Sequence, residues 1–198
     1  MNKPMKTKNS KKIINIILGS FLLGLGVVFA NMSLYGADPL SYFWYGVALR
    51  FNTTIGIANI FVSLVLLIGP LIFDRSQINI GTILSPLMIS LTIDTLLPNA
   101  PVITNPIVRV LLLLLAVYTY AWGVSIYVYQ NLGRSTYDGI IEILRIKTNI
   151  SRARAKTIVD ALMFIGAILM GAPFRIGPFV FVLLAGFLIG KTIKFLDR

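Results

Sequence analysis

Three long runs without a charged residue constrain this chain more than any other feature. Residues 13–37, 51–73 and 110–133 contain 25, 23 and 24 uncharged residues, respectively. A helix needs about 20 predominantly apolar residues to cross the hydrocarbon core of a bilayer. Only 13% of the whole chain is charged, against about 25% in an average soluble domain. These runs therefore predict three membrane-spanning helices.

Three shorter runs extend this prediction. Residues 76–93, 161–174 and 176–190 contain 18, 14 and 15 uncharged residues. Runs of about 10–14 residues also suit a core helix or a re-entrant segment, but they become spans if flanking lysines extend their ammonium groups to the membrane surface. We therefore expect about six transmembrane helices, forming one all-α integral membrane domain over residues 1–198.

The chain begins with a basic segment, residues 1–12, followed by the first apolar run. A cleaved signal peptide has an apolar region of only about 7–15 residues, which is shorter than this run. We therefore expect a retained first helix preceded by a cytoplasmic N-terminus.

The composition excludes several kinds of functional site. The chain contains no Cys and no His, which excludes disulfides, thiolate metal sites and imidazole bases. It also lacks the glycine-rich G-x-x-x-x-G-K-[ST] loop that binds nucleotide phosphates. We predict no enzyme activity, no catalytic residue, no metal site and no cofactor.

The sequence repeats its features at a spacing of 97 residues. Gly26, Gly36 and Asn52 align with glycine or asparagine 97 positions later. Each half contains a long span, a glycine, a short amphipathic segment, a Thr or Ser, and two further spans. This order predicts repeat 1 over residues 13–97 and repeat 2 over residues 107–196, with helices at residues 14–35, 39–49, 55–73, 82–97, 107–131, 136–146, 152–172 and 178–195.

The basic residues predict the orientation of these spans. With six spans and a cytoplasmic N-terminus, 15 of the 18 Lys and Arg residues face the cytoplasm, and only Arg50, Arg109 and Arg175 face outside. Such an excess is the pattern of the positive-inside rule. The C-terminus is then also cytoplasmic. Because three spans is an odd number, the second half must be inserted upside down relative to the first, as in many secondary transporters.

The two short segments, residues 39–49 and 136–146, have two interpretations. Asp38-Pro39 is typical of an N-cap followed by proline in the first helical turn, and Ser135 with Asp138 resembles a capping box. Thr54, Ser151 and Thr82 also suit helix caps. We expect the short helices to lie in the membrane interface, with re-entrant helices lining a cavity as the alternative.

Several stretches resemble the YczE/YyaS/YitT group of bacterial integral membrane proteins over roughly residues 13 to 196. The stretches are LGSFLLGLGVVFANMSLYGADP, TTIGIANIFVSLVLLIG and INIGTILSPLMISLTIDTLL in the first half, and GRSTYDGIIEIL and FRIGPFVFVLLAGFLIGKTI in the second. The resemblance implies a fold rather than an activity, and a location in the bacterial cytoplasmic membrane. It also implies a G-x-x-P-x-D-like pattern after the first span of each half, from which each half departs once, at Ser41 and at Thr136.

Ionisable residues inside a membrane are functional candidates by default. Asp160 lies early in the fifth expected span and Asp94 lies late in the third. Either carboxylate suits a cation or proton site, or a contact to a basic group of a substrate. The structural alternative is an interfacial carboxylate paired with a neighbour, and Lys156, one turn before Asp160, is such a neighbour.

Four further polar residues complete the candidate substrate or ion site. Asn59 and Ser63 share one face of the second span, where they either line a polar path or form interhelical hydrogen bonds. Asp138 and Glu142 share one face of the short helix at residues 136–146.

Three functions remain open at this point. The inverted repeat and the membrane acids favour a small-molecule or ion transporter or permease. The alternatives are a non-transporting scaffold, sensor or assembly partner, and a substrate-binding membrane subunit of a multi-component transporter. The net charge of +11 is explained by topology and by anionic lipid headgroups at the cytoplasmic loops, so we expect no nucleic acid. The expected partners are the lipid bilayer, an unidentified small-molecule substrate and, as a further hypothesis, other copies in a homo-oligomer.

Overall fold

A computed structural model describes residues 9–196 of the chain. These residues form helices and connecting segments without a strand, which confirms the all-α prediction. Two 3-10 turns, η1 (Arg75–Gln77) and η2 (Leu97–Asn99), flank α4. The α-helices are α1 (Asn9–Met32), α2 (Pro39–Phe51), α3 (Ile55–Phe73), α4 (Ile80–Leu96), α5 (Pro106–Tyr129), α6 (Thr136–Thr148), α7 (Arg152–Leu169) and α8 (Gly177–Leu196). Residues 1–8 of the basic segment 1–12 lie outside the described residues.

Five of these helices are long and apolar enough to cross a membrane, namely α1, α3, α4, α5 and α8. Large apolar side chains such as Phe61 and Leu183 are exposed on their outer faces, which indicates contact with lipid rather than water. The chain is therefore an integral membrane protein. The predicted fifth span, α7, does not meet the same standard, because its first nine residues include four charges, at Arg152, Arg154, Lys156 and Asp160.

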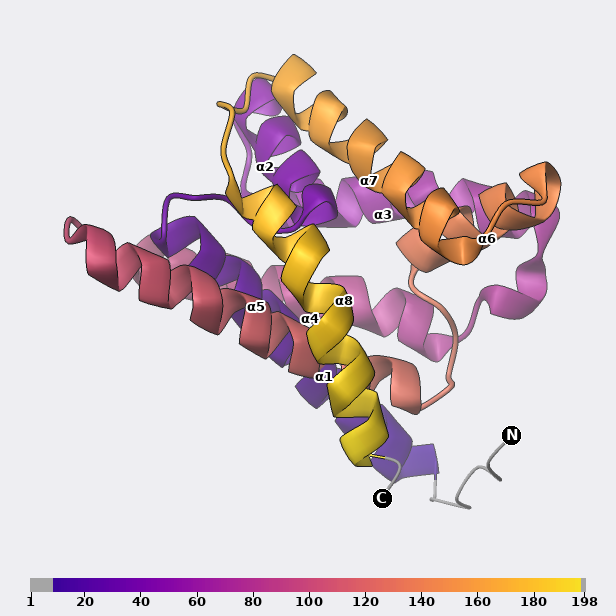
Figure 1. Cartoon of the computed structure of the whole chain (residues 1–198). Helices are drawn as coiled ribbons and strands as arrows, with labels where there is room; N and C mark the ends of the chain where they lie inside the picture. The colour runs from indigo at the N-terminus through magenta and orange to yellow at the C-terminus, as the bar shows by residue number, and fades with distance from the viewer. Residues whose placement is uncertain (1–8, 197–198) are drawn as a thin grey trace.

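The helices form two layers (Figure 1). One layer contains α1, α4, α5 and α8, and the other contains α2, α3, α6 and α7. At the centre of the first layer, α1 and α5 cross antiparallel, because Gly19 meets Gly123 whereas Gly26 meets Ala116. Small residues at these points let the two backbones approach closely, which is a common basis of helix association in membranes.

Side-chain caps begin four of the helices as predicted. Asp38, Thr54, Ser135 and Ser151 each accept a hydrogen bond from the backbone N–H three residues later. The prediction that Thr82 caps α4 is wrong in its detail. Asn79 is the N-cap, and Thr82 is the third helical residue of a reciprocal capping box.

Local structure recurs at the predicted spacing of 97 residues. Leu34, Gly36 and Asn52 have positive φ, and so do the residues 97 positions later, Asn131, Gly133 and Asn149. Hydrogen bonds between the halves follow a similar spacing. The N–H of Gly177 donates to the carbonyl of Tyr35 at 2.7 Å, and the N–H of Gly81 donates to the carbonyl of Leu132 at 3.1 Å. The inverted orientation of the halves across a bilayer stays a prediction.

Each short helix begins inside the molecule and ends at its surface. The N-cap of α2, Asp38, is buried, whereas its last residue, Phe51, is 65% exposed. Similarly, α6 begins at the buried Thr136 and ends at the exposed Thr148. Helix α2 packs mainly against α7 and α3, and α6 packs against α3 and α7. The chain doubles back after α1 so that α2 starts within the second layer (Figure 1).

Candidate functional site

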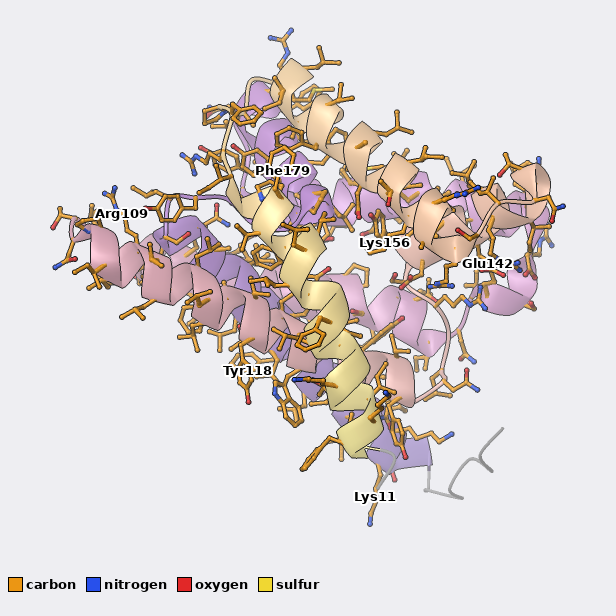
Figure 2. All side chains as sticks on the ribbon, in the orientation of Figure 1. Lys11, Arg109, Tyr118, Glu142, Lys156 and Phe179 are labelled. Atoms are coloured by element: carbon orange, nitrogen blue, oxygen red, sulfur yellow. The ribbon has the colours of Figure 1, made fainter. Side chains whose placement is uncertain are left out.

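Asp160 on α7 is a buried carboxylate held by two residues. It is 5% exposed. The ammonium of Lys156, one turn earlier on α7, donates to Oδ2 at 2.7 Å, and the hydroxyl of Tyr137 on α6 donates to Oδ1. Figure 2 shows Lys156 on α7 near the crossing with α6. Both oxygens are therefore hydrogen-bonded, as a charged carboxylate removed from water requires.

A second buried carboxylate, Asp38, lies at the start of α2, the helix that packs against α7. It is also 5% exposed, and its Oδ2 accepts the N–H of Ser41 at 3.3 Å. Its Oδ1 has no hydrogen-bond partner among the described residues, and neither has the hydroxyl of the buried Ser41. The Asp38 carboxylate lies within electrostatic range of both Lys156 and Asp160.

Two tyrosines complete this group. Tyr120 on α5 and Tyr137 on α6 both lie within electrostatic range of Asp38 and Asp160. We call Asp38, Tyr120, Tyr137, Lys156 and Asp160 the central acid cluster. Its members come from the segment before α2 and from α5, α6 and α7, so residues of both halves form it.

Sequence reasoning predicted Asp160 but missed Asp38 as a site residue. The Asp38-Pro39 pattern was explained by capping alone, which the structure confirms but which uses only one of the two carboxylate oxygens. One signal was present in the sequence. Between Lys12 and Arg50, Asp38 is the only charged residue.

The predicted site residue Asp94 lies on α4 and makes its hydrogen bonds to the start of α3. The hydroxyl of Thr54 donates to Oδ2 at 2.7 Å, and the N–H of Gly56 donates to Oδ1 at 2.9 Å. A carboxylate at a helix N-terminus satisfies free N–H groups and interacts favourably with the helix dipole. Helix capping therefore accounts for Asp94 without a ligand.

Asn59 and Ser63 on α3 belong to a hydrogen-bonded network with α4. The Asn59 amide nitrogen donates to the Pro86 carbonyl and to the Ser90 hydroxyl, each at 3.0 Å. The Ser63 hydroxyl donates to the Asn59 carbonyl oxygen at 3.1 Å, and Ser90 donates to the Gly56 carbonyl at 2.7 Å. These bonds join α3 to α4, as the packing interpretation of the sequence expects.

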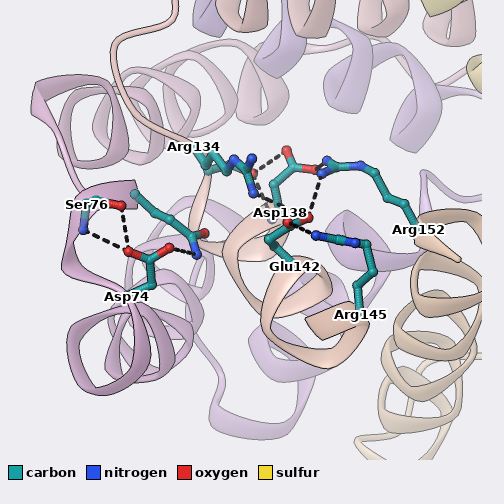
Figure 3. Close-up of polar contacts among 9 residues, drawn as sticks. Asp74, Ser76, Arg134, Asp138, Glu142, Arg145 and Arg152 are labelled. Atoms are coloured by element: carbon teal, nitrogen blue, oxygen red, sulfur yellow. Dashed lines mark hydrogen bonds and ion pairs between the residues drawn. The ribbon is translucent and has the colours of Figure 1, made fainter. Parts of the chain in front are cut away.

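Asp138 and Glu142 on α6 lie in a cluster of arginines (Figure 3). Arg152 contacts Asp138 at 2.7 Å and Glu142 at 3.3 Å. Arg145 contacts Glu142 at 2.7 Å and Arg134 contacts it at 3.4 Å. The hydrogen bond from Arg145, aided by the charges of the three arginines, lowers the pKa of Glu142 below its usual value.

A polar cavity of about 280 Å³ adjoins this arginine cluster. The buried Gln77 contributes an amide oxygen without a partner among the described residues. Sequence patterns could not indicate this cavity, because its walls come from two connecting segments far apart in the chain and from Glu142 on α6. The lining residues are Asp74, Ser76, Gln77, Asn79, Asn131, Gly133, Arg134 and Glu142.

The apolar helices and the buried acids together define a multi-helix membrane protein with a hydrophobic core that also encloses carboxyl groups. The family model described as "Family of unknown function (DUF6198)" matches residues 10–198, so the chain belongs to this family. The chain is also similar to "Uncharacterized protein YyaS" of Bacillus subtilis (strain 168), with 22% identity over 184 residues, covering 91% of this chain and 92% of that protein. The resemblance to a YyaS-like group is thereby confirmed. No solved structure matches the chain.

Proposed function

We propose that the protein is a secondary transporter or permease for a small molecule or ion in the bacterial cytoplasmic membrane. The observation that carries this proposal is Asp160 on α7, a buried carboxylate in a membrane protein, held by Lys156 and Tyr137. Charged side chains within membranes are rare and typically mark substrate or ion pathways.

The pair can also exchange partners. Removing a carboxylate from water costs several kcal/mol, and apolar residues of similar size are often equally stable or more stable in its place. Stability alone therefore gives little reason to retain the pair. Lys156 is exposed at its side chain whereas Asp160 is buried, so a basic group of a substrate could replace the lysine at Asp160.

The fold supports alternating access around this point. The two halves pack across the α1–α5 crossing, and both short helices begin inside the molecule. We infer that α2 and α6 are re-entrant rather than interfacial, because Tyr42, Trp44 and Ile141 are buried against protein instead of facing lipid. In transporters built from inverted repeats, interrupted helices of this kind meet at a central binding site.

With α7 counted as a span, which makes six, the charge distribution supports cytoplasmic N- and C-termini. Arg109 lies at the opposite side of the molecule from Glu142 and its arginines (Figure 2). In the proposed orientation the arginine-rich end of α6 and α7 faces the cytoplasm, in line with the positive-inside rule. Anionic lipid headgroups then attract the same basic surface.

A solute screen followed by flux measurements tests the proposal. Thermal unfolding of the purified protein is first followed by tryptophan fluorescence across a metabolite panel that includes amines, amino acids and inorganic ions. Each stabilising solute is then tested for uptake into proteoliposomes. We expect Asp160→Asn to lower uptake at least tenfold and Asp74→Asn, at an exposed connecting segment, to leave it unchanged. Full uptake by Asp160→Asn would refute the assignment of the site.

The same measurements separate the two alternatives. Recovery of one stoichiometric membrane partner, with neither solute stabilisation nor flux, would replace the transporter with a scaffold or sensor. Solute stabilisation without flux until such a partner is added would identify a substrate-binding subunit.

A further inference from the structure

The Asp38 carboxyl group is incompletely paired although it is buried. Only one of its oxygens accepts a hydrogen bond, from the N–H of Ser41. No atom within residues 9–196 lies in hydrogen-bonding geometry with Oδ1, although the neutral hydroxyls of Ser41 and Tyr120 lie near this carboxylate. Buried polar atoms are nearly always hydrogen-bonded, so an exception requires an explanation such as a bound water, ion or proton.

The charges around Asp38 do not balance. The cluster contains two carboxylates, Asp38 and Asp160, but one ammonium, Lys156, which already contacts Asp160. With all three groups ionised the net charge is −1. An uncompensated charge in a low-dielectric interior is strongly unfavourable, and such a group takes up a proton or a counter-ion instead.

The other groups around Asp38 provide no positive charge that would balance this net charge of −1. Helix α5 provides Tyr120 and α6 provides Tyr137, which are neutral, and α7 provides Lys156 and Asp160. Arg175, before α8, lies over the ring of Tyr45 at 5.5 Å. Helix α3, which packs against α2, has no acidic, basic or tyrosine residue, and α8, which also contacts α2, has Lys191 and Lys194 only in its C-terminal part.

A proton satisfies these conditions better than a metal ion. No group of three or more acidic residues that could hold a metal occurs within the described part of the chain, and Ca²⁺ or Mg²⁺ needs six or more oxygen ligands. A proton needs one oxygen, and Oδ1 is free. Protonation converts the carboxylate to a neutral carboxylic acid, and the net charge of the three groups changes from −1 to zero.

We infer that Asp38 is a proton-binding site, and that its proton exchanges in step with the partners of Asp160 during transport. The coupling between this proton and the partners of Asp160 rests on the proposed function. The proton site at Asp38 rests only on the burial of Asp38, its free oxygen and the charge count. An exchangeable proton at this point would make the protein a proton-coupled carrier.

Infrared difference spectroscopy of the full chain in lipid nanodiscs tests the inference without a substrate. Aspartate labelled with carbon-13 at the side-chain carboxyl shifts the carbonyl band of any protonated aspartic acid. The wild-type protein should show such a shifted band, and the band should disappear as the pH is raised. Asp38→Asn should remove it, whereas Asp74→Asn should retain it.

Asp38→Glu provides a second variant if Asp38→Asn does not fold. The protonated band should remain in Asp38→Glu but lose its aspartate isotope shift. Absence of the band in the wild type, or its persistence in Asp38→Asn, would overturn the inference. Uptake by Asp160→Asn tests transport independently of the spectra, because the band of Asp38 can be present whether or not the protein transports.

Discussion

Asp38, Asn59 and Asp94 show how differently buried or half-buried polar side chains are used in this protein. Asn59 has each of its amide atoms engaged between α3 and α4, and Asp94 has both oxygens engaged at the start of α3. Asp38 retains one free oxygen. The sequence predicted a cap for Asp38 and candidate site residues at Asn59 and Asp94, but not which oxygen remains free, because that depends on tertiary contacts.

Tyr137→Phe should weaken the hold on Asp160. The substitution removes the hydroxyl that donates to Oδ1 and leaves a buried carboxylate oxygen unpaired, which costs about 1–3 kcal/mol. Tyr118→Phe is the matched control, because Tyr118 is exposed on α5. Chemical unfolding in detergent should show a lower free energy of unfolding for Tyr137→Phe only. Equal stability of both variants would contradict the role of Tyr137.

Glu142 should contribute to stability in a pH-dependent way. Its pKa is lower in the folded protein than in the unfolded chain, chiefly because of Arg145. The stabilisation is therefore present above the unfolded pKa, about 4.3, and is lost as the pH falls through the lower folded pKa. Glu142→Gln should lower the melting temperature at neutral pH, and the difference should shrink at acidic pH. A difference that grows on acidification would contradict this account.

At the level of helices, local patterns in the sequence predicted the element order and most helix starts. Asp38, Thr54, Ser135 and Ser151 are caps as predicted, since capping depends on residues close in sequence. The number of spans was less accurate, because the apolar part of α7 begins only after Asp160 and is shorter than in the other long helices.

Gly123→Ala should destabilise the crossing of α1 and α5. A Cβ at this position would lie 2.6 Å from the carbonyl oxygen of Gly19 and from the backbone nitrogen of Leu23. Backbone atoms cannot rotate away, and overpacking of this kind costs about 1–3 kcal/mol.

Gly186→Ala on α8 is the control, because nothing lies within 4 Å of its added Cβ. This variant should be neutral or slightly more stable, since alanine favours helix more than glycine. Thermal unfolding of both variants measures the contrast, and a neutral Gly123→Ala would mean that the crossing is loosely packed.

For the whole molecule, the sequence predicted two similar halves but not how they interlock. The packing of α3 on α6 and of α2 on α7 joins helices of different halves. The central acid cluster depends on this packing between the halves, because Asp38 comes from the first half and Tyr137 from the second. Nothing in the spacing of residues within one half could indicate it.

Cysteine labelling should define the orientation, because the native chain has no Cys to interfere. Lys147→Cys lies at the arginine-rich end of α6 and should react with a membrane-impermeant maleimide only after cells are opened. Arg109→Cys lies at the opposite side (Figure 2) and should react in intact cells. Labelling of Lys147→Cys from outside would reverse the proposed topology.

The two hydrogen bonds between the halves, from Gly177 to Tyr35 and from Gly81 to Leu132, bear on how the protein is made. Tyr35 leaves the ribosome well before Gly177, and α3 is synthesised before α6, the helix that covers it. The first four helices are therefore synthesised before the helices of the second half that they contact. The contacts between the halves are therefore completed only when the last helix reaches the connecting segment after α1.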